Sequence, residues 1–320
     1  MSLLPSVQIG RSKKRLLPLG VGGSFYGLDH GSQQGEADIL DAFEAALEKG
    51  LTHFDTATGY GGGYSERLMG RFMADRRDGI FLASKAHMDD LSAQAMIAAI
   101  DASRARLQTD YIDLYYLHWP RTGKDMRRWM EGLETARQQG KIRAVGVSNF
   151  TVEQMQSLAE VGRIDAYQLG YNLLWRFSEK DVLSYCVKHD IDVVVYSALA
   201  HGILSGKYGR TLDFAPGDQR WRITLFRADV WPQVYEGVEA FKQLAAREGI
   251  PLAHLALRWL LRQPGVKSVL VSAKNRQQVL DNRQALDVDI PDEVMKKLTA
   301  LSDQVMQSVP DEGNPFSYHP

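Results

Sequence analysis

Residues 112–120 read Ile-Asp-Leu-Tyr-Tyr-Leu-His-Trp-Pro, an apolar run that ends abruptly in a histidine, His118. Two earlier segments share this plan: residues 52–55 end in the carboxylate of Asp55, and residues 80–85 end in the amine of Lys85. The pattern indicates buried β-strands that each carry a polar group at the carboxyl end. A barrel of parallel strands gathers those ends at one mouth, where that fold performs its chemistry.

Strand-like and helix-like segments alternate along nearly the whole chain. Several strand-like segments are continuous apolar runs, such as Val193-Val194-Val195, which is typical of parallel strands covered on both faces. Eight strands alternating with helices predict an α/β fold, the (β/α)8 TIM barrel, with an open doubly wound sheet as the alternative. The strands are predicted at 17–22, 51–55, 80–84, 112–117, 143–147, 165–169, 192–196 and 268–272.

Amphipathic segments predict the helices between these strands. Leu40, Phe43 and Leu47 form one apolar stripe that stops at Gly50. Thr151 and Gln154 have the spacing of a capping box, which predicts that another helix begins there. Further helices are predicted at 66–76, 91–108, 126–139, 178–189, 251–263, 275–285 and 292–305.

The segments outside this alternation are few. Residues 198–231 show little periodicity, and a loop of that length predicts a lid or binding segment. The chain after Ser302 is predicted to be an irregular C-terminal extension, and the chain before 17 to form a β-hairpin. No linker-like stretch divides the sequence, so we expect one domain over 1–320.

Composition excludes several classes of function. The 38 Lys and Arg nearly cancel the 39 Asp and Glu, so no net charge attracts nucleic acid or an anionic membrane, and we expect a small-molecule partner. The single cysteine, Cys186, cannot form an internal disulfide and fits a reducing compartment. No apolar run is long enough for a membrane span and no signal peptide opens the chain, so we expect a cytoplasmic protein of open oligomeric state.

The strand-end groups, together with Tyr60 just after the second strand, suit proton transfer. A carboxylate such as Asp55 favours the charged form of Lys85, and that charge would lower the pKa of Tyr60 from about 10 towards neutrality. His118 could then orient a substrate oxygen. Each group also has a structural interpretation, since Asp55 could cap a turn and His118 could pack in a core. Their equivalent positions at strand ends favour the functional interpretation.

Other familiar motifs are absent from the sequence. The glycines at 20, 22 and 23, and those at 59 and 61–63, lack the spacing of a dinucleotide-binding fingerprint or a P-loop. The histidines show no metal-ligand spacing, so we expect no metal site.

In their order and spacing these residues resemble the aldo-keto reductase superfamily over nearly the whole chain. The resemblance is closest to the bacterial and channel-β-subunit-like branches, and it implies a (β/α)8 barrel that binds a nicotinamide cofactor in an extended conformation. It rests on Phe54-Asp55-Thr56-Ala57, Tyr60-Gly61, Ser65-Glu66-Arg67-Leu68-Met69-Gly70, Ser84-Lys85, Leu117-His118-Trp119, Gly146-Val147-Ser148-Asn149-Phe150, Tyr171-Asn172-Leu173-Leu174 and residues 272–282.

The same resemblance implies roles for the strand-end residues. Tyr60 would be the general acid in carbonyl reduction, and Lys85 would lower its pKa. Asp55 would pair with Lys85, and His118 would orient the carbonyl. Phe25 and Trp119 are predicted to line the substrate pocket.

The resemblance also implies a set of cofactor-binding residues. Ser148, Asn149 and Gln168 match positions that hold the carboxamide, and Tyr196 matches the ring that stacks on the nicotinamide. The loop from Leu199 folds over the pyrophosphate in the family. The remaining matches are Ser197, Gly202, Ser205, Lys207, Ser272, Ala273, Lys274, Arg276, Gln278 and Asn282.

Positive charge at Lys274 and Arg276 favours a 2′-phosphate and hence NADP(H). Ala198, Ser272 and Gln278 depart from the residues most common in the family, and the last two leave NAD(H) open. We therefore expect NADP(H)-dependent reduction of small aldehydes or ketones to alcohols. The alternatives are an NAD-dependent sugar or pyridoxal dehydrogenase and a cofactor-sensing regulatory subunit.

Overall fold

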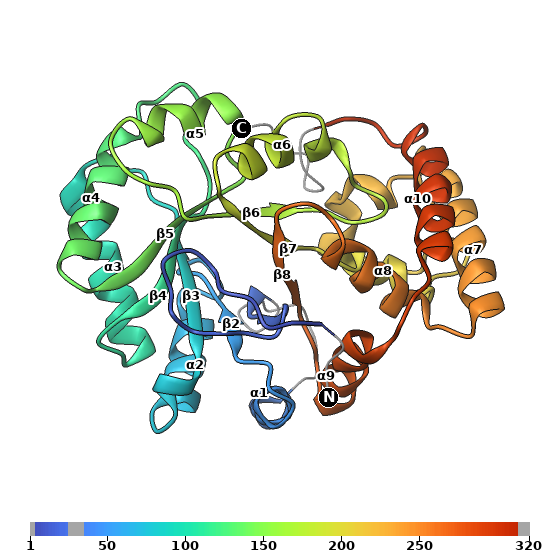
Figure 1. Ribbon diagram of the computed structural model, residues 1–320, viewed down its shortest axis with the longest axis horizontal. Helices are drawn as coiled ribbons and strands as arrows, with labels where there is room; N and C mark the ends of the chain where they lie inside the picture. Colours follow the sequence, from blue (N-terminus) through green and yellow to red (C-terminus); the bar gives the residue numbers. More distant parts are fainter. Residues whose placement is uncertain (1–3, 25–34, 313–320) are drawn as a thin grey trace.

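In the computed structural model, which describes residues 4–24 and 35–312, eight parallel strands close into a barrel with helices around it (Figure 1). Each strand pairs with the next along the chain, and the first pairs with the last. The (β/α)8 prediction is confirmed, and the open sheet is excluded. The strands are β1 (Leu19–Gly22), β2 (His53–Asp55), β3 (Phe81–Ala86), β4 (Ile112–Leu117), β5 (Ile142–Ser148), β6 (Ala166–Gly170), β7 (Asp192–Tyr196) and β8 (Val266–Val271).

The helices follow the predicted alternation with two exceptions. The segment predicted as one helix at 178–189 is a 3-10 turn followed by α6, and α7 was not predicted. Val234, Val238 and Phe241 are buried at helical spacing, so a signal for α7 was present. The helices are α1 (Glu36–Glu48), α2 (Tyr64–Met73), α3 (Ala93–Leu107), α4 (Arg127–Gln138), α5 (Val152–Ala159), α6 (Val182–Lys188), α7 (Trp231–Glu248), α8 (Leu252–Leu261), α9 (Arg276–Gln284) and α10 (Asp292–Met306).

Local sequence signals explain several helix ends. The Thr151 hydroxyl accepts from the backbone N–H of Gln154 at 3.2 Å, and the Gln154 side chain accepts from the N–H of Thr151 at 2.9 Å. The predicted capping box of α5 is therefore confirmed. Gly50 follows α1 with a positive φ of 76°, as a helix stop requires.

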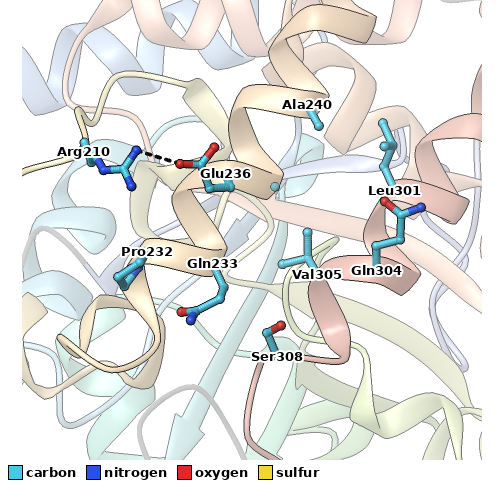
Figure 2. A pocket seen from close by; sticks show the side chains of 10 residues that line it. Arg210, Pro232, Gln233, Glu236, Ala240, Leu301, Gln304, Val305 and Ser308 are labelled. Atoms are coloured by element: carbon cyan, nitrogen blue, oxygen red, sulfur yellow. Dashed lines mark hydrogen bonds and ion pairs between the residues drawn. The ribbon is translucent and has the colours of Figure 1, made fainter.

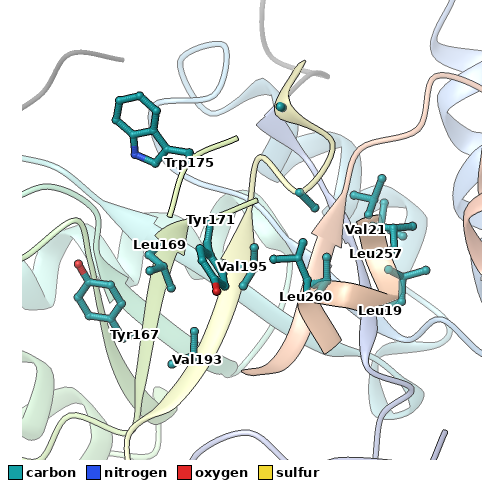
Figure 3. Close-up of a cluster of buried hydrophobic side chains, with 14 of the residues drawn as sticks. Leu19, Val21, Tyr167, Leu169, Tyr171, Trp175, Val193, Val195, Leu257 and Leu260 are labelled. Atoms are coloured by element: carbon teal, nitrogen blue, oxygen red, sulfur yellow. The ribbon is translucent and has the colours of Figure 1, made fainter. Parts of the chain in front are cut away.

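The alternation of side chains along each strand divides the apolar residues into two clusters. Val193 and Val195 of β7 face outward and belong to the same buried cluster as Leu257 and Leu260 of α8 (Figure 3). Val194 points the other way, into a second cluster that fills the barrel with residues such as Leu114 and Tyr116. The barrel is thus a packed core, and chemistry is confined to its ends.

The N-terminal segment closes the amino end of the barrel. The backbones of Val7 and Leu16 exchange two hydrogen bonds of 2.8 Å, so the predicted hairpin is a single antiparallel bridge. Ile9 and Leu16 join the interior cluster. The N–H of Gly10 donates to Oδ2 of Asp192, the first residue of β7, at 2.7 Å. The opposite end, where the strands finish, is left for the site.

The predicted lid at 198–231 is more structured than its sequence suggests. It contains three short 3-10 helices, η4 (Ala200–Ser205), η5 (Gln219–Arg222) and η6 (Thr224–Phe226). Edge-to-face packing of Tyr208 on Phe214 and Phe226, with centroids 5.5 and 5.4 Å apart, gives the lid its own small core. The irregular extension after α10 is anchored to this lid, because Glu312 pairs with Arg227 at 2.6 Å.

Gly146 of β5 provides a test of the packing inside the barrel. A Cβ at this position would lie 2.3 Å from Cδ1 of the buried Tyr116 ring. We predict that Gly146→Ala lowers the free energy of unfolding by about 2 kcal/mol, because the ring must move. Urea unfolding measures this. A Cβ at Gly79 meets nothing within 4 Å, so Gly79→Ala is the control and should cause no loss; equal losses would contradict the packing described.

Candidate active site

Asp55, Tyr60, Lys85 and His118 meet at the carboxyl-end mouth of the barrel. Asp55 ends β2, Lys85 lies near the end of β3, His118 directly follows β4, and Tyr60 lies in the turn after β2. Nζ of Lys85 lies 2.5 Å from Oδ1 of Asp55 and 3.4 Å from the hydroxyl of Tyr60. The rings of Tyr60 and His118 meet edge-to-face with centroids 5.8 Å apart. The four groups predicted from separate strand ends are therefore adjacent.

Asp55 and Lys85 form an ion pair that is buried on both sides. Burial works against the charge of Lys85, but Asp55 and Tyr60 outweigh it and raise the pKa of Lys85 above its ordinary value. Burial likewise raises the pKa of Asp55, against the opposing effects of Lys85 and of Gln168, whose amide donates to Oδ2 at 2.8 Å. The amine keeps its proton, so a fixed positive charge faces the Tyr60 hydroxyl.

The effect on Tyr60 differs from the expectation drawn from the sequence. Burial raises the pKa of Tyr60 above its ordinary value of 10, by more than Lys85 lowers it. The direction is therefore opposite to the expected shift towards neutrality, because the effect of burial on the phenol exceeds that of the positive charge of Lys85. A phenol that stays protonated at neutral pH is suited to donate a proton.

His118 is held neutral. Burial lowers the pKa of His118 well below its ordinary value of 6.5, and the charges of Lys85 and His87 lower it further. A neutral imidazole carries one N–H donor and one acceptor nitrogen. Beside Tyr60, it supplies a second hydrogen-bond donor without adding charge.

Asn149 joins the ends of three strands next to this group. Its Nδ2 donates to the carbonyl of His118 at 3.1 Å and to Oγ of Ser148 at 3.0 Å, and its Oδ1 accepts from the hydroxyl of Tyr196 at 2.7 Å. The Tyr196 ring lies across Gly170, where a Cβ would be 3.1 Å from Cζ. The residues predicted to hold a carboxamide thus form one polar wall beside Asp55, with Gln168 bonded directly to it.

The first turn of the lid has an unusual backbone. Ser197, Ala200 and His201 have positive φ values of 53°, 47° and 55°, and Gly202 follows at 88°. The side chain of Lys207 folds back over Gly202, because a Cβ there would lie 2.9 Å from Nζ. The predicted positions Leu199 and Ser205 lie on this same turn, so the lid places Lys207 over its own backbone.

Lys274, in the turn after β8, interacts electrostatically with charged residues of the lid. Burial lowers the pKa of Lys274, and the charges of Lys207 and Arg220 lower it further. Arg220 was not predicted from the sequence. It lies in the aperiodic lid, and only the contacts of the fold bring it near Lys274. Three cations gathered in this way suit phosphate groups, so the residues present fit a phosphorylated nucleotide.

Other predicted cofactor residues have structural partners. Arg276 turns towards α1, where it pairs with Asp41 at 2.8 Å and Glu48 at 2.7 Å. Gln278 accepts from the N–H of Lys274 at 2.7 Å. Ser272 donates to the carbonyl of Gly22 at 2.9 Å. Ala273 is buried and Asn282 half-buried. The turn is therefore preformed, while Arg276 joins α9 to α1.

The predicted substrate pocket is described only in part. Phe25 lies outside the described residues. Trp119 is half-buried beside His118, with ring centroids 5.8 Å apart. Within residues 4–24 and 35–312, no group of three or more His, Cys, Asp or Glu side chains is placed to hold a metal ion.

A groove of about 420 Å³ lies away from this mouth, between α7 and α10 (Figure 2). Gly237 of α7 and Val305 of α10 line it, and Arg210 pairs with Glu236 at its edge at 2.8 Å. None of the four strand-end residues lines this groove.

The described part of the chain contains no helix with the length and apolar character needed to cross a membrane.

The buried ion pair can be tested through stability. We predict that Asp55→Asn lowers the free energy of unfolding by about 3 kcal/mol, because Lys85 is left buried without its counter-charge. The double variant Asp55→Asn, Lys85→Met should recover most of this loss, since it removes both charges. Urea unfolding of the three proteins decides the point. Additive losses in the double variant would mean that the two side chains do not act as a pair.

Comparison with known proteins agrees with this geometry. Residues 18–303 match the model of the Aldo/keto reductase family. Aldo-keto reductase YhdN of Bacillus subtilis is 34% identical over 76% of this chain and 77% of its own. The NADH-specific methylglyoxal reductase of Escherichia coli is 29% identical over 79% and 84%. The structure of glycerol dehydrogenase AKR11B4 from Gluconobacter oxydans superposes with a TM-score of 0.86, at 30% identity over 97% of this chain and 98% of that one. The chain therefore belongs to the aldo/keto reductase family of oxidoreductases, which reduce carbonyl compounds.

Proposed function

We propose that this protein reduces small aldehydes or ketones to alcohols with NADP(H), and that Tyr60 is the proton donor. The observation that carries the proposal is the contact chain from Asp55 through Lys85 to Tyr60, at 2.5 and 3.4 Å. It places a protonated phenol beside a fixed positive charge at the mouth of the barrel. Reduction of a carbonyl develops negative charge on oxygen, and preorganised donors at that point lower the barrier most.

Each of the four strand-end residues has a separate role in this reaction. Tyr60 donates its proton to the carbonyl oxygen as charge develops there, and Lys85 stabilises the phenolate that remains. His118, held neutral, donates its N–H to the same oxygen and so orients the substrate. Asp55 keeps Lys85 charged in a buried position.

The residues beside this group would hold the nicotinamide cofactor. Ser148, Asn149 and Gln168 offer amide and hydroxyl groups that can form hydrogen bonds with a carboxamide. Tyr196 offers a ring that can stack on the nicotinamide. When bound, the cofactor supplies the hydride that carbonyl reduction requires. Asp55 and Lys85, the charged neighbours of Tyr60, are both buried. The packing of the barrel therefore keeps water away from this ion pair.

The choice of NADPH rests on the cations at the other end of the site. Lys207, Arg220 and Lys274 together favour a cofactor with an extra phosphate. A second candidate is an NAD-dependent dehydrogenase. It is supported by Arg276, which is engaged by Asp41 and Glu48, and by an NADH-specific protein among the relatives.

We predict that Tyr60→Phe lowers kcat for reduction of small aldehydes by a factor of about 10² to 10⁴, because the proton donor is lost. Cofactor oxidation followed at 340 nm measures this, and cofactor titration should show a Kd changed less than about twofold. Tyr64→Phe is the matched control, since the Tyr64 hydroxyl donates to Glu36 instead. Equal activity of Tyr60→Phe and the wild type would end the proposed role.

Lys274 and Arg276 give a test of cofactor choice. We predict that Lys274→Met raises the Kd for NADPH about tenfold and changes the Kd for NADH less, because one phosphate contact is lost. Arg276→Met should leave both Kd values close to those of the wild type, since Arg276 is bound to α1. Fluorescence titration with each cofactor measures both. Tighter binding of NADH than of NADPH by the wild type would favour the second candidate.

A further inference from the structure

Tyr208 lies in the lid and contacts two of its cations, Lys207 and Arg220. Its hydroxyl accepts a hydrogen bond from Nη1 of Arg220 at 3.1 Å and donates one to the carbonyl of His201 at 3.0 Å. Nζ of Lys207 lies 5.0 Å from the centre of its ring. One side chain therefore links the turn that carries Lys207 to the 3-10 helix that carries Arg220.

The aromatic neighbours of Tyr208 fix it in place. Its ring packs edge-to-face on Phe214, Phe226 and Trp231, with centroids 5.5, 5.4 and 6.3 Å apart. Phe214 in turn supports the guanidinium of Arg220, whose Cζ lies 3.9 Å from the ring centroid. The lid core thus holds the hydroxyl of Tyr208 and the plane of Arg220 in one arrangement.

Arg220 is held on its remaining side by Asp218. Nε donates to Oδ1 at 2.9 Å and Nη2 donates to Oδ2 at 2.6 Å. With the bond to Tyr208, three of the five N–H donors of the guanidinium are used. Within the described part of the chain, no residue accepts from the other two, so each terminal nitrogen keeps one N–H for a ligand.

Several charged groups gather at this point of the lid. Burial lowers the pKa of Lys274, the nearby charges of Lys207 and Arg220 lower it further, and Asp218 opposes them. An arrangement of like charges with directed N–H groups fits a phosphate anion. Long cationic side chains otherwise lose conformational freedom when they bind, and a lid that orders them beforehand reduces this loss.

We propose that Tyr208 is a positioning residue that gathers Lys207 and Arg220 into one anion site for the phosphate groups of the nucleotide cofactor. The inference rests on the proposed function, because it requires a nucleotide at the mouth. Tyr208 itself does not contact the ligand and acts through Lys207 and Arg220.

The test compares Tyr208→Phe with Tyr235→Phe. Each variant removes one hydroxyl from the aromatic cluster where the lid meets α7. The ring centroids of Tyr235 and Trp231 in α7 are 6.1 Å apart. No described residue bonds the hydroxyl of Tyr235. Fluorescence titration with NADPH and NADH should show a Kd about five- to tenfold higher for Tyr208→Phe and changed less than twofold for Tyr235→Phe.

A double-variant cycle separates positioning from a purely structural role. The variant Arg220→Gln should weaken cofactor binding about tenfold or more, and adding Tyr208→Phe to it should weaken binding little further, because the hydroxyl acts through Arg220. A purely structural role of Tyr208 would instead lower the melting temperature in either background and leave the cofactor Kd as it was.

Each result decides the proposal. A higher Kd for both cofactors supports the site with the pyrophosphate as its ligand, and a higher Kd for NADPH alone supports it with the 2′-phosphate. Unchanged Kd values in Tyr208→Phe, or fully additive losses in the double variant, would overturn it. If the wild type binds neither nucleotide, the proposed function fails as well; if it binds both and Tyr208→Phe does not differ, only this inference fails.

Discussion

The buried ion pair between Asp55 and Lys85 is the constraint on which the candidate site depends. Two charges placed in a packed barrel are stable only together, at 2.5 Å and with their remaining hydrogen-bonding groups satisfied. Gln168 bonds the second oxygen of Asp55, and the carbonyl of Thr56 accepts from Lys85 at 2.8 Å. Asp55 and Lys85 lie at the carboxyl ends of β2 and β3, Thr56 directly follows β2, and Gln168 lies in β6. The register of the barrel therefore fixes the charge that faces Tyr60.

The two ends of the mouth use charge in different ways. At the proton-transfer end, Asp55 compensates the single positive charge of Lys85. Burial keeps the neighbouring Tyr60 and His118 uncharged. At the lid, Lys207 and Arg220 lie around Tyr208, and we propose that these two cations bind a charged ligand. Under the proposed function, proton transfer would take place beside a buried ion pair, and the cofactor phosphates would bind beside exposed cations. Lys207 and Lys274 are exposed, whereas Asp55 and Lys85 are buried.

Much of the fold could be predicted because its signals are local. The apolar runs of β4 and β7 matched their predicted bounds, and the capping box of α5 is visible as two residues in sequence. The proximity of Asp55, Lys85 and His118 could be predicted because parallel strands bring their ends together. What the sequence does not reveal depends on distant contacts. Arg276 pairs with Asp41 of α1, and the charge of Arg220 acts on Lys274 only because the lid is folded. The pKa of Tyr60 depends on burial that no single strand reveals.

The protonation of Tyr60 is the most direct measure of the account. A ¹³C label on the ζ carbon of tyrosine, with the resonance of Tyr60 assigned by its loss in Tyr60→Phe, reports the charge of this phenol as pH is varied. In the cofactor-free protein we predict that the resonance stays that of the neutral phenol up to about pH 10, since burial holds the pKa of Tyr60 above that value. A titration centred near pH 7 would contradict the account, because Tyr60 would then lack the proton it is required to donate.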